Sequence, residues 1–198
     1  MSMVRILYAG FWLSTNPYPS RNSDSDSTTI LFLIQSICKS LKVLILKSQV
    51  LLNSPSSVHL PNLEILYLQK IKYKNDDSVR RILVGCPVLD QLHVVRSRTD
   101  NVTTSRISHL TLDWFVMENR VQDPNFKLHV NAPSLQYCYL RDQNLKNYLL
   151  DNATNVVEAN IGDLFERGEQ DENDNYGHSI YQLLRALPNV ATLTLRNK

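Results

Sequence analysis

The sequence predicts an α/β fold in which short repeats stack into a solenoid, and three observations support this prediction. A short apolar phrase, L-x-x-L-x-L in its ideal form, recurs along the chain. Its period averages about 25 residues, within the range of leucine-rich repeats. Proline stands two residues before four of the phrases, at Pro61, Pro87, Pro133 and Pro188, where it ends the preceding segment and presets an extended strand.

The phrase occurs seven times, and each copy is identified by its first apolar residue. These anchors are Leu41, Leu63, Leu89, Ile107, Leu135, Val156 and Val190. We therefore expect a right-handed α/β horseshoe-type superhelix of about seven irregular leucine-rich repeats, because one repeat cannot bury its leucines alone and must stack on its neighbours. The alternative is an ordinary α/β domain whose buried strands resemble one another, and the recurrent proline favours the repeats.

The N-terminal part of the chain, residues 1–29, is expected to be a flexible segment that does not repeat. Residues 16–29 are rich in Ser, Asp, Asn and Pro, which is the composition of a linker. The repeat domain is expected over residues 30–198. It begins with apolar residues at helical spacing over residues 30–41, and this helix is predicted to cover the first edge of the sheet, since a bare edge invites pairing with another chain.

One complete repeat lies between the second and third phrases. Residues 75–78, Asn-Asp-Asp-Ser, are typical of a helix start, residues 79–83 of a short helix, and Gly85 of its end. The interval after the third phrase is short and polar, which predicts a tight loop without a helix. Residues 126–130 alternate between apolar and polar and predict an additional short strand.

The last interval is the longest because it holds an acidic insertion, residues 165–177, whose composition predicts a solvated loop. A calcium-binding loop is the alternative. It lacks the required glycine, where Tyr176 stands, and the terminal glutamate, where Gln182 stands. Ser179 is expected to cap a helix that runs to Leu187, before the final strand.

Composition places the chain in the globular class and excludes several partners. Of 198 residues, 43% are hydrophobic and 20% are charged, and the formal net charge is +2, so neither nucleic acid nor an anionic membrane is expected as partner. No run of 18 apolar residues occurs, which argues against a membrane span. The three cysteines, Cys38, Cys86 and Cys138, are widely spaced and form neither a disulfide framework nor a metal knuckle.

The compartment expected from the cysteines is a reduced intracellular one, the cytoplasm or the nucleus. Residues 4–13 are apolar enough to suggest a weak signal-peptide core, but Arg5 and Gly10 interrupt them. The sequons at Asn101 and Asn152 would matter only in a secreted protein.

No catalytic constellation is present in the sequence. It contains no G-x-S-x-G, no H-E-x-x-H and no glycine loop that could hold a phosphate. His93 and His109 fall on neighbouring phrases, and Asp113 is the one further ligand near them, which is too little for a metal site. We therefore expect no enzyme, no metal and no cofactor.

The functional surface is expected on the concave face of the solenoid. Alternate residues of a strand point to opposite faces, so the variable positions of each phrase line this face. Tyrosine and arginine are frequent anchors of protein interfaces, so these residues predict a protein-binding surface. They are Ile65, Tyr67, Gln69, Gln91, His93, His109, Thr111, Asp113, Tyr137, Tyr139, Arg141, Thr192, Thr194 and Arg196.

The amino-acid sequence of the repeats resembles that of the plant F-box/FBD/leucine-rich-repeat family over about residues 36–198. The resemblance is carried by LKVL at 41–44, SVHLPNL at 57–63, DDSVRRILVGCPVL at 76–89, APSLQY at 132–137 and VEANI at 157–161. It implies that the repeats present a surface to a protein to be ubiquitinated. In that family an N-terminal F-box docks on the Skp subunit of a cullin-type (SCF) E3 ubiquitin ligase.

The similarity concerns the substrate-recognition half of such a subunit. The sequence motif of an F-box is not found in residues 1–40, and no FBD sequence motif follows the last repeat. A Skp subunit is therefore an expected partner only if residues 1–27 hold a divergent docking element. The alternatives are a truncated or degenerate family member without a ligase role, a secreted leucine-rich-repeat binding protein, and an enzyme whose site lies on loops.

Overall fold

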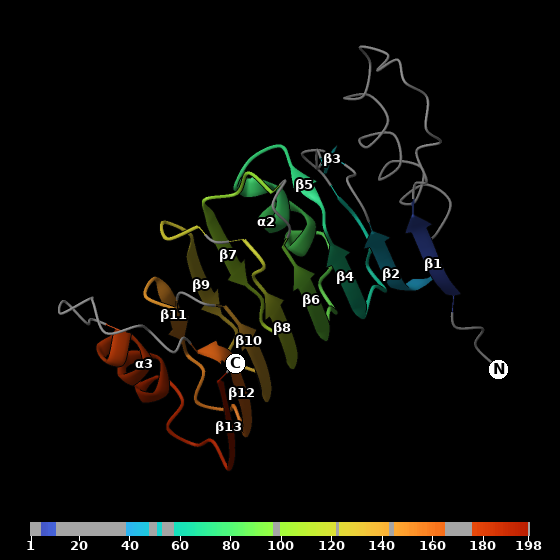
Figure 1. Ribbon diagram of the computed structural model, residues 1–198. Coiled ribbons are helices and arrows are strands. Elements are labelled where there is room, and N and C mark those ends of the chain that lie inside the picture. Colours follow the sequence, from blue (N-terminus) through green and yellow to red (C-terminus); the bar gives the residue numbers. More distant parts are fainter. Residues whose placement is uncertain are drawn as a thin grey trace.

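Eight parallel strands form one continuous sheet in the computed structural model of the protein (Figure 1). The structure describes residues 5–10, 39–47, 51–52, 58–96, 100–121, 123–142, 145–164 and 176–197. In order across the sheet, the strands are β1 (Arg5–Gly10), β2 (Leu41–Lys47), β4 (Ile65–Gln69), β6 (Gln91–Val95), β8 (Trp114–Glu118), β10 (Tyr137–Arg141), β12 (Glu158–Leu164) and β13 (Thr192–Asn197).

A second layer covers one side of this large sheet. It contains a three-stranded parallel sheet of β7 (Thr104–Ser108), β9 (Lys127–Asn131) and β11 (Tyr148–Asp151), and a two-stranded sheet of β3 (Leu51–Leu52) and β5 (Lys72–Tyr73). Helix α2 (Asp77–Val84) packs against β7, and helix α3 (Tyr176–Arg185) against β11. Figure 1 shows α2 and the three-stranded sheet on the same side of the large sheet.

The core lies between the two layers and follows from the period of two in a strand. Leu66 and Leu68 of β4 are fully buried, while the residues between and beside them are half-buried on the other face. Phe115 of β8 and Phe126, which precedes β9, are the largest fully buried side chains among the described residues. Burying each such side chain stabilises the fold by about 1.5–3 kcal/mol, and only stacked repeats provide that burial. The predicted leucine-rich-repeat solenoid is confirmed.

One repeat was assigned to the wrong phrase. The residues around Ile107 form β7 in the small sheet, and the large sheet instead takes β8 from the phrase anchored at Leu112. Leu112 lies 23 residues after Leu89 and 23 before Leu135, so the true spacing is even. Phe115 and Met117 fill the two inward positions of that phrase, where aliphatic residues were expected.

Side chains in the turns before four of the strands tie their repeats to the preceding ones. Each donates a hydrogen bond to a backbone carbonyl of the preceding turn: Asn62 to Lys39 (2.8 Å), Ser134 to Leu110 (2.7 Å), Asn155 to Pro133 (2.7 Å) and Asn189 to Thr154 (2.6 Å). Carbonyls at the edge of a strand-and-turn stack need such partners. The polar residue that follows Pro61, Pro133 and Pro188 is therefore structural, and Asn155 has the same role without a preceding proline.

A buried polar ladder runs behind the ends of three strands. Arg96, Asn119 and Asp142 each follow a strand of the large sheet, and they lie 23 residues apart. Arg96 donates to Asn119 (3.4 Å), and Asn119 donates to Asp142 (2.7 Å). Tyr148 donates its hydroxyl to the same carboxylate of Asp142. The ladder links three consecutive repeats inside the core.

Helix α2 confirms the predicted helix and its end at Gly85. A side chain cannot be accommodated at Gly85, because a Cβ there would lie 2.3 Å from the carbonyl oxygen of Val58. The residue before the helix, Asp76, makes no capping bond within it. Its carboxylate instead accepts hydrogen bonds from the backbone N–H groups of Thr103 and Thr104, which fixes the helix to the start of β7.

Two predicted boundaries are corrected at the C-terminal side. Helix α3 begins at Tyr176, so Ser179 lies inside the helix and is not its cap. The acidic insertion expected over residues 165–177 accordingly ends before Tyr176, and its remainder lies outside the described residues. Leu193 and Leu195 occupy the core-facing positions of the final strand and are 43% and 48% exposed.

The N-terminal prediction is also corrected in part. Arg5–Gly10 was expected to lie in a flexible, non-repeating segment, yet it forms β1 and pairs in parallel with β2. The rest of residues 1–29 and most of the helix expected over residues 30–41 lie outside the described residues, while Leu41 at the end of that span belongs to β2. Within the part of the chain that the structure covers, no helix has both the length and the apolar character needed to cross a membrane.

Candidate functional site

The face of the large sheet that points away from the core is not covered by any element in the described parts of the chain, and we call it the open face. The pairing of the strands arranges its side chains in three rows across the sheet. The first row is Val43, Ile65, Gln91, Trp114, Tyr137, Glu158 and Thr192. The middle row is Ile45, Tyr67, His93, Val116, Tyr139, Asn160 and Thr194. The third is Lys47, Gln69, Val95, Glu118, Arg141 and Gly162, with Arg196 beside Gly162.

Most of the residues predicted for a binding surface lie on the open face. They are Ile65, Tyr67, Gln69, Gln91, His93, Tyr137, Tyr139, Arg141, Thr192, Thr194 and Arg196. Their placement follows from the alternation of strand residues, which the phrase fixes in every repeat that was correctly located.

Three residues that were predicted for the open face do not belong to its rows. Their phrase, anchored at Ile107, was expected in the large sheet but forms β7 of the small one. His109 is buried, and its Nε2 lies 2.9 Å from the carbonyl oxygen of Cys86. Thr111 lies in the turn before β8 and donates a hydrogen bond to the carbonyl of Leu89 (2.8 Å). Asp113 immediately precedes β8, at the border of the open face. His93 and His109 thus lie on different sides of the sheet.

The residues of β8 and β12 on this face were missed. Trp114, Val116 and Glu118 take the positions that the phrase at Ile107 was expected to fill. Glu158 and Asn160 belong to a phrase that was recognised, but its outward positions were not followed. The even spacing of the anchor at Leu112 is the signal that finds the first three.

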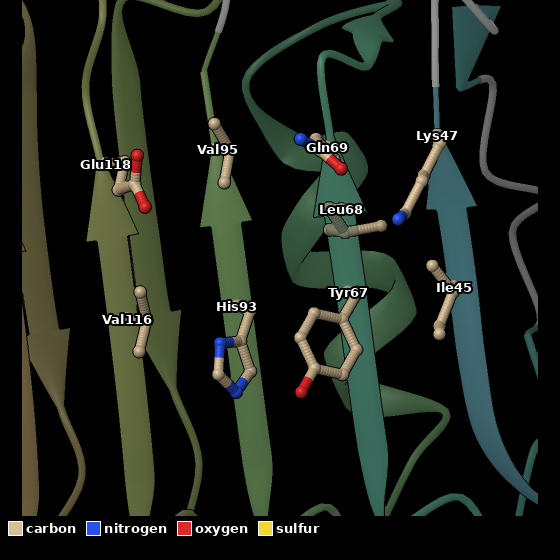
Figure 2. Close-up of a pocket in the computed structure, with 9 residues that line it drawn as sticks. All are labelled: Ile45, Lys47, Tyr67, Leu68, Gln69, His93, Val95, Val116 and Glu118. Atoms are coloured by element: carbon tan, nitrogen blue, oxygen red, sulfur yellow. The ribbon is translucent and has the colours of Figure 1, made fainter.

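A hollow of about 310 Å³ lies on the open face over β2, β4, β6 and β8 (Figure 2). Figure 2 shows four side chains of the middle row side by side at one end of it: Ile45, Tyr67, His93 and Val116. Lys47, Gln69, Val95 and Glu118 of the third row line the other end, and Leu68 completes the lining. The hollow is therefore lined by both apolar and polar side chains, with one charge of each sign, Lys47 and Glu118, at its third-row end.

Two pairs of aromatic rings stack across neighbouring strands. The rings of Tyr67 and His93 have centroids 4.1 Å apart and planes inclined by 19°. Those of Trp114 and Tyr137 are 3.6 Å apart and inclined by 15°. Each pair occupies directly opposite positions on adjacent strands, and the strand spacing of about 4.8 Å brings such rings into contact. Both pairs are held in place before any partner binds.

Two polar atoms on the middle row are buried and have no hydrogen-bond partner among the described residues: Nε2 of His93 and Oδ1 of Asn160. Burial lowers the pKa of His93 below its usual value, so its imidazole is neutral at neutral pH. A buried polar atom without a partner destabilises a fold unless something pairs with it. Both atoms are therefore suited to hydrogen bonds with a bound molecule.

The described groups of the open face are suited to contacts with another molecule. The thiols of Cys86 and Cys138 are buried in the core, and burial raises the pKa of each to about 12, so they are poor nucleophiles. No group of three His, Cys, Asp or Glu side chains is placed to hold a metal ion within the described ranges. Stacked rings, a hollow and unpaired polar atoms instead offer contacts to another molecule.

The family model described as "FBD-associated F-box protein At5g56370, LRR repeats" matches residues 21–160. The chain belongs to this family. This family match confirms the resemblance that the repeat phrases carry. It runs from before β2 into β12. No solved structure matches the chain.

Curated relatives from Arabidopsis thaliana carry the same family words in their names. F-box/FBD/LRR-repeat protein At4g00160 is 31% identical over 156 residues, which are 78% of this chain and 33% of that protein. F-box/FBD/LRR-repeat protein At3g52680 is 32% identical over 128 residues, 64% of this chain and 28% of that protein. The chain spans about a third of the length of the curated relatives it matches.

Proposed function

We propose that this chain is a non-catalytic protein-recognition domain and that it acts as the substrate-recognition part of an F-box subunit of a cullin-type ubiquitin ligase. The observation that carries the proposal is the open face itself, a continuous surface across the large sheet with two aromatic stacks and a hollow. Its occupant is a segment of the protein to be ubiquitinated.

The side chains of the open face fit this role. Tyrosine and tryptophan bring large contact areas at little loss of conformational entropy, and they are enriched among the residues that dominate interface energies. Here Tyr67, Trp114 and Tyr137 are already stacked, so a partner would not have to order them. The hollow is of a size to hold one or two side chains of a partner.

The names of the relatives support the connection to a ligase. An F-box protein docks on a Skp subunit through its F-box, and its repeats are free to hold a substrate. The family match concerns the repeats, so docking on Skp is proposed for a segment away from the open face. Such a ligase works in the cytoplasm or the nucleus, and the two buried, unpaired thiols of Cys86 and Cys138 are compatible with a reducing compartment.

The test is purification of the tagged full chain from plant cells, beside a variant that carries Tyr67→Ala and Trp114→Ala. Wild-type protein is expected to retain proteins that the double variant loses, and these proteins should accumulate when the proteasome is inhibited. Leu149→Ala is the matched control, because Leu149 is 53% exposed on β11, away from the open face. Thermal melting establishes that all three proteins are folded.

The Skp subunit provides the second readout. It should be retained by wild type, double variant and control alike, because it docks elsewhere. Identical sets of retained proteins for wild type and double variant would contradict recognition by the open face. Proteins that depend on the open face, found without any Skp subunit, would leave a recognition domain with no ligase role.

A further inference from the structure

The open face has one region, around Tyr137, where aromatic surface, a carboxylate and an unpaired polar atom meet. Trp114 stacks on one face of Tyr137. On the next strand, Glu158 lies directly opposite Tyr137, so it borders the ring on the side away from Trp114. Asn160 follows two residues later on the same face of β12, about 7 Å farther along the strand. These residues form one continuous surface.

This region is negatively charged at the end where β6, β8 and β12 begin, because Asp90, Asp113 and Glu158 lie there. Asp90, Asp113 and Glu158 form no ion pair within 4 Å in the described part of the molecule, whereas the neighbouring Glu64 pairs with Lys42. Burial, together with Asp90, raises the pKa of Asp113, and burial, together with Glu158, raises the pKa of Tyr137. A cation bound here would relieve the repulsion between these groups.

Asn160 provides an independent observation that points to a bound donor. Its side chain is only 9% exposed, and its Oδ1 is buried without a hydrogen-bond partner among the residues that the structure describes. An amide oxygen can only accept, so the missing partner must be an N–H or O–H donor. Together with Glu158, it offers acceptors to a group that carries several donors.

We propose that this region binds an arginine side chain of the protein partner, with the guanidinium against Tyr137 and its N–H groups on Glu158 and Asn160 Oδ1. This inference rests on the proposed function and names the chemistry of the bound segment. A guanidinium is planar, stacks on aromatic rings, and has five donors in a fixed fork, so it can contact a ring, a carboxylate and an amide oxygen at once. A lysine ammonium is a point charge and stacks less well.

Two cations of the protein itself lie near this region, Arg141 and Arg196, and both flank Gly162. Arg196 lowers the pKa of Tyr137, yet it forms no ion pair within 4 Å with Glu158. Arg196 lies beside Gly162, farther along β12 than Asn160. Arg196 borders the region at the end opposite to the carboxylates. A basic segment of the partner would therefore place its positive charge toward the carboxylates and away from Arg196.

The experiment is a selection of random peptides displayed on phage against the full chain, followed by affinity measurements on synthetic copies of the selected peptides. Peptides bound by wild type are expected to be enriched in arginine. Replacing that arginine by citrulline, its neutral isostere, should weaken binding about tenfold, as should Glu158→Gln, because each removes a charge-assisted hydrogen bond. Lysine in the same place should restore only part of the affinity.

Glu118→Gln is the matched control variant. Glu118 is also a glutamate on the open face, but it pairs with Arg120 and lies in a different row. Peptides that need Tyr67 and Trp114 but are not enriched in arginine, or that bind Glu158→Gln as well as wild type, would refute the arginine site and leave the proposed function standing. Equal loss with Glu118→Gln would also refute it. Selected peptides that are insensitive to every open-face variant, or no selected peptides at all, would count against both.

Discussion

Arg96 carries the most sharply testable claim about the fold. Its side chain is 3% exposed, and that of its partner Asp100 is 1% exposed, with Nε and Oδ2 2.7 Å apart. The guanidinium also donates to the carbonyl of Val102 (2.6 Å) and lies 3.6 Å from the ring centroid of Phe126. Arg96→Met removes the cation and leaves the Asp100 carboxylate buried alone, which destabilises a protein by about 3–5 kcal/mol.

The assay is equilibrium unfolding in urea of wild type, Arg96→Met, Asp100→Leu and the double variant. Each single variant should lose about 3–5 kcal/mol of unfolding free energy. The double variant should be no less stable than either single one, because neither charge is then left unpaired. The coupling energy is therefore about 3–5 kcal/mol or more. The control is Arg80→Met, since Arg80 pairs with Asp77 at the surface with both side chains about half exposed, and it should change stability by less than about 1 kcal/mol.

Two results would refute the reasoning on Arg96. A loss below about 1 kcal/mol in Arg96→Met would mean that the pair is hydrated and does not behave as buried. Additive losses in the double variant would mean that Arg96 and Asp100 act on separate parts of the fold.

Three further predictions concern the packing of the repeats and the protonation of two histidines. Gly85→Ala should destabilise by about 1–3 kcal/mol or more, because the new Cβ meets the backbone of Val58, and the urea midpoint measures this. Asn155→Ala should lose about 1 kcal/mol with the hydrogen bond to the preceding turn, and an unchanged midpoint would contradict it. Burial lowers the pKa of His93 and His109 below 6.5, so the unfolded chain binds more protons below that pH. Their stabilisation is complete above pH 6.5 and is lost as the pH falls through the lowered values. Tm should accordingly decrease from about pH 7.5 to about pH 5, and less so in His93→Gln.

The solenoid could be predicted because the apolar residues of each phrase are the same residues that are buried between the repeats. Leucines at Leu63, Leu66 and Leu68 recur at the next repeat as Leu89, Leu92 and Val94, and each set is buried. The repeat at Leu112 was not recognised, since an aromatic residue and a methionine replace the two later aliphatic residues of its phrase. A rule based on side-chain volume and spacing would have found it, whereas a rule based on leucine alone did not.

The buried polar ladder could not be predicted from residue types. Arginine and aspartate directly after a strand are usually exposed, and the polar stretch after Val95 was predicted only to be a tight loop without a helix. The pairing of Arg96 with Asp100 depends on the tertiary fold, which also brings the guanidinium to the carbonyl of Val102 and the ring of Phe126. The 23-residue spacing from Arg96 to Asn119 and Asp142 is the one signal in the sequence that marks these positions as equivalent.

For the open face, the sequence predicted which side chains share a surface and not how they interact. Tyr67 and His93 were placed correctly by the alternation of strand residues, but their stacking depends on the register of β4 and β6. Asn160 and its unpaired oxygen could not be singled out, since an isolated asparagine in a strand carries no pattern.

The most direct test of recognition by the open face is site-specific photo-crosslinking in plant cells. A photoreactive phenylalanine analogue is introduced at Tyr67, within the hollow, and, in a second protein, at Leu149 on β11. The proposal predicts discrete crosslinked partners from position 67, lost when Trp114→Ala is added, and none shared with position 149. Crosslinks from position 149 alone, or the same partners from both positions, would contradict it.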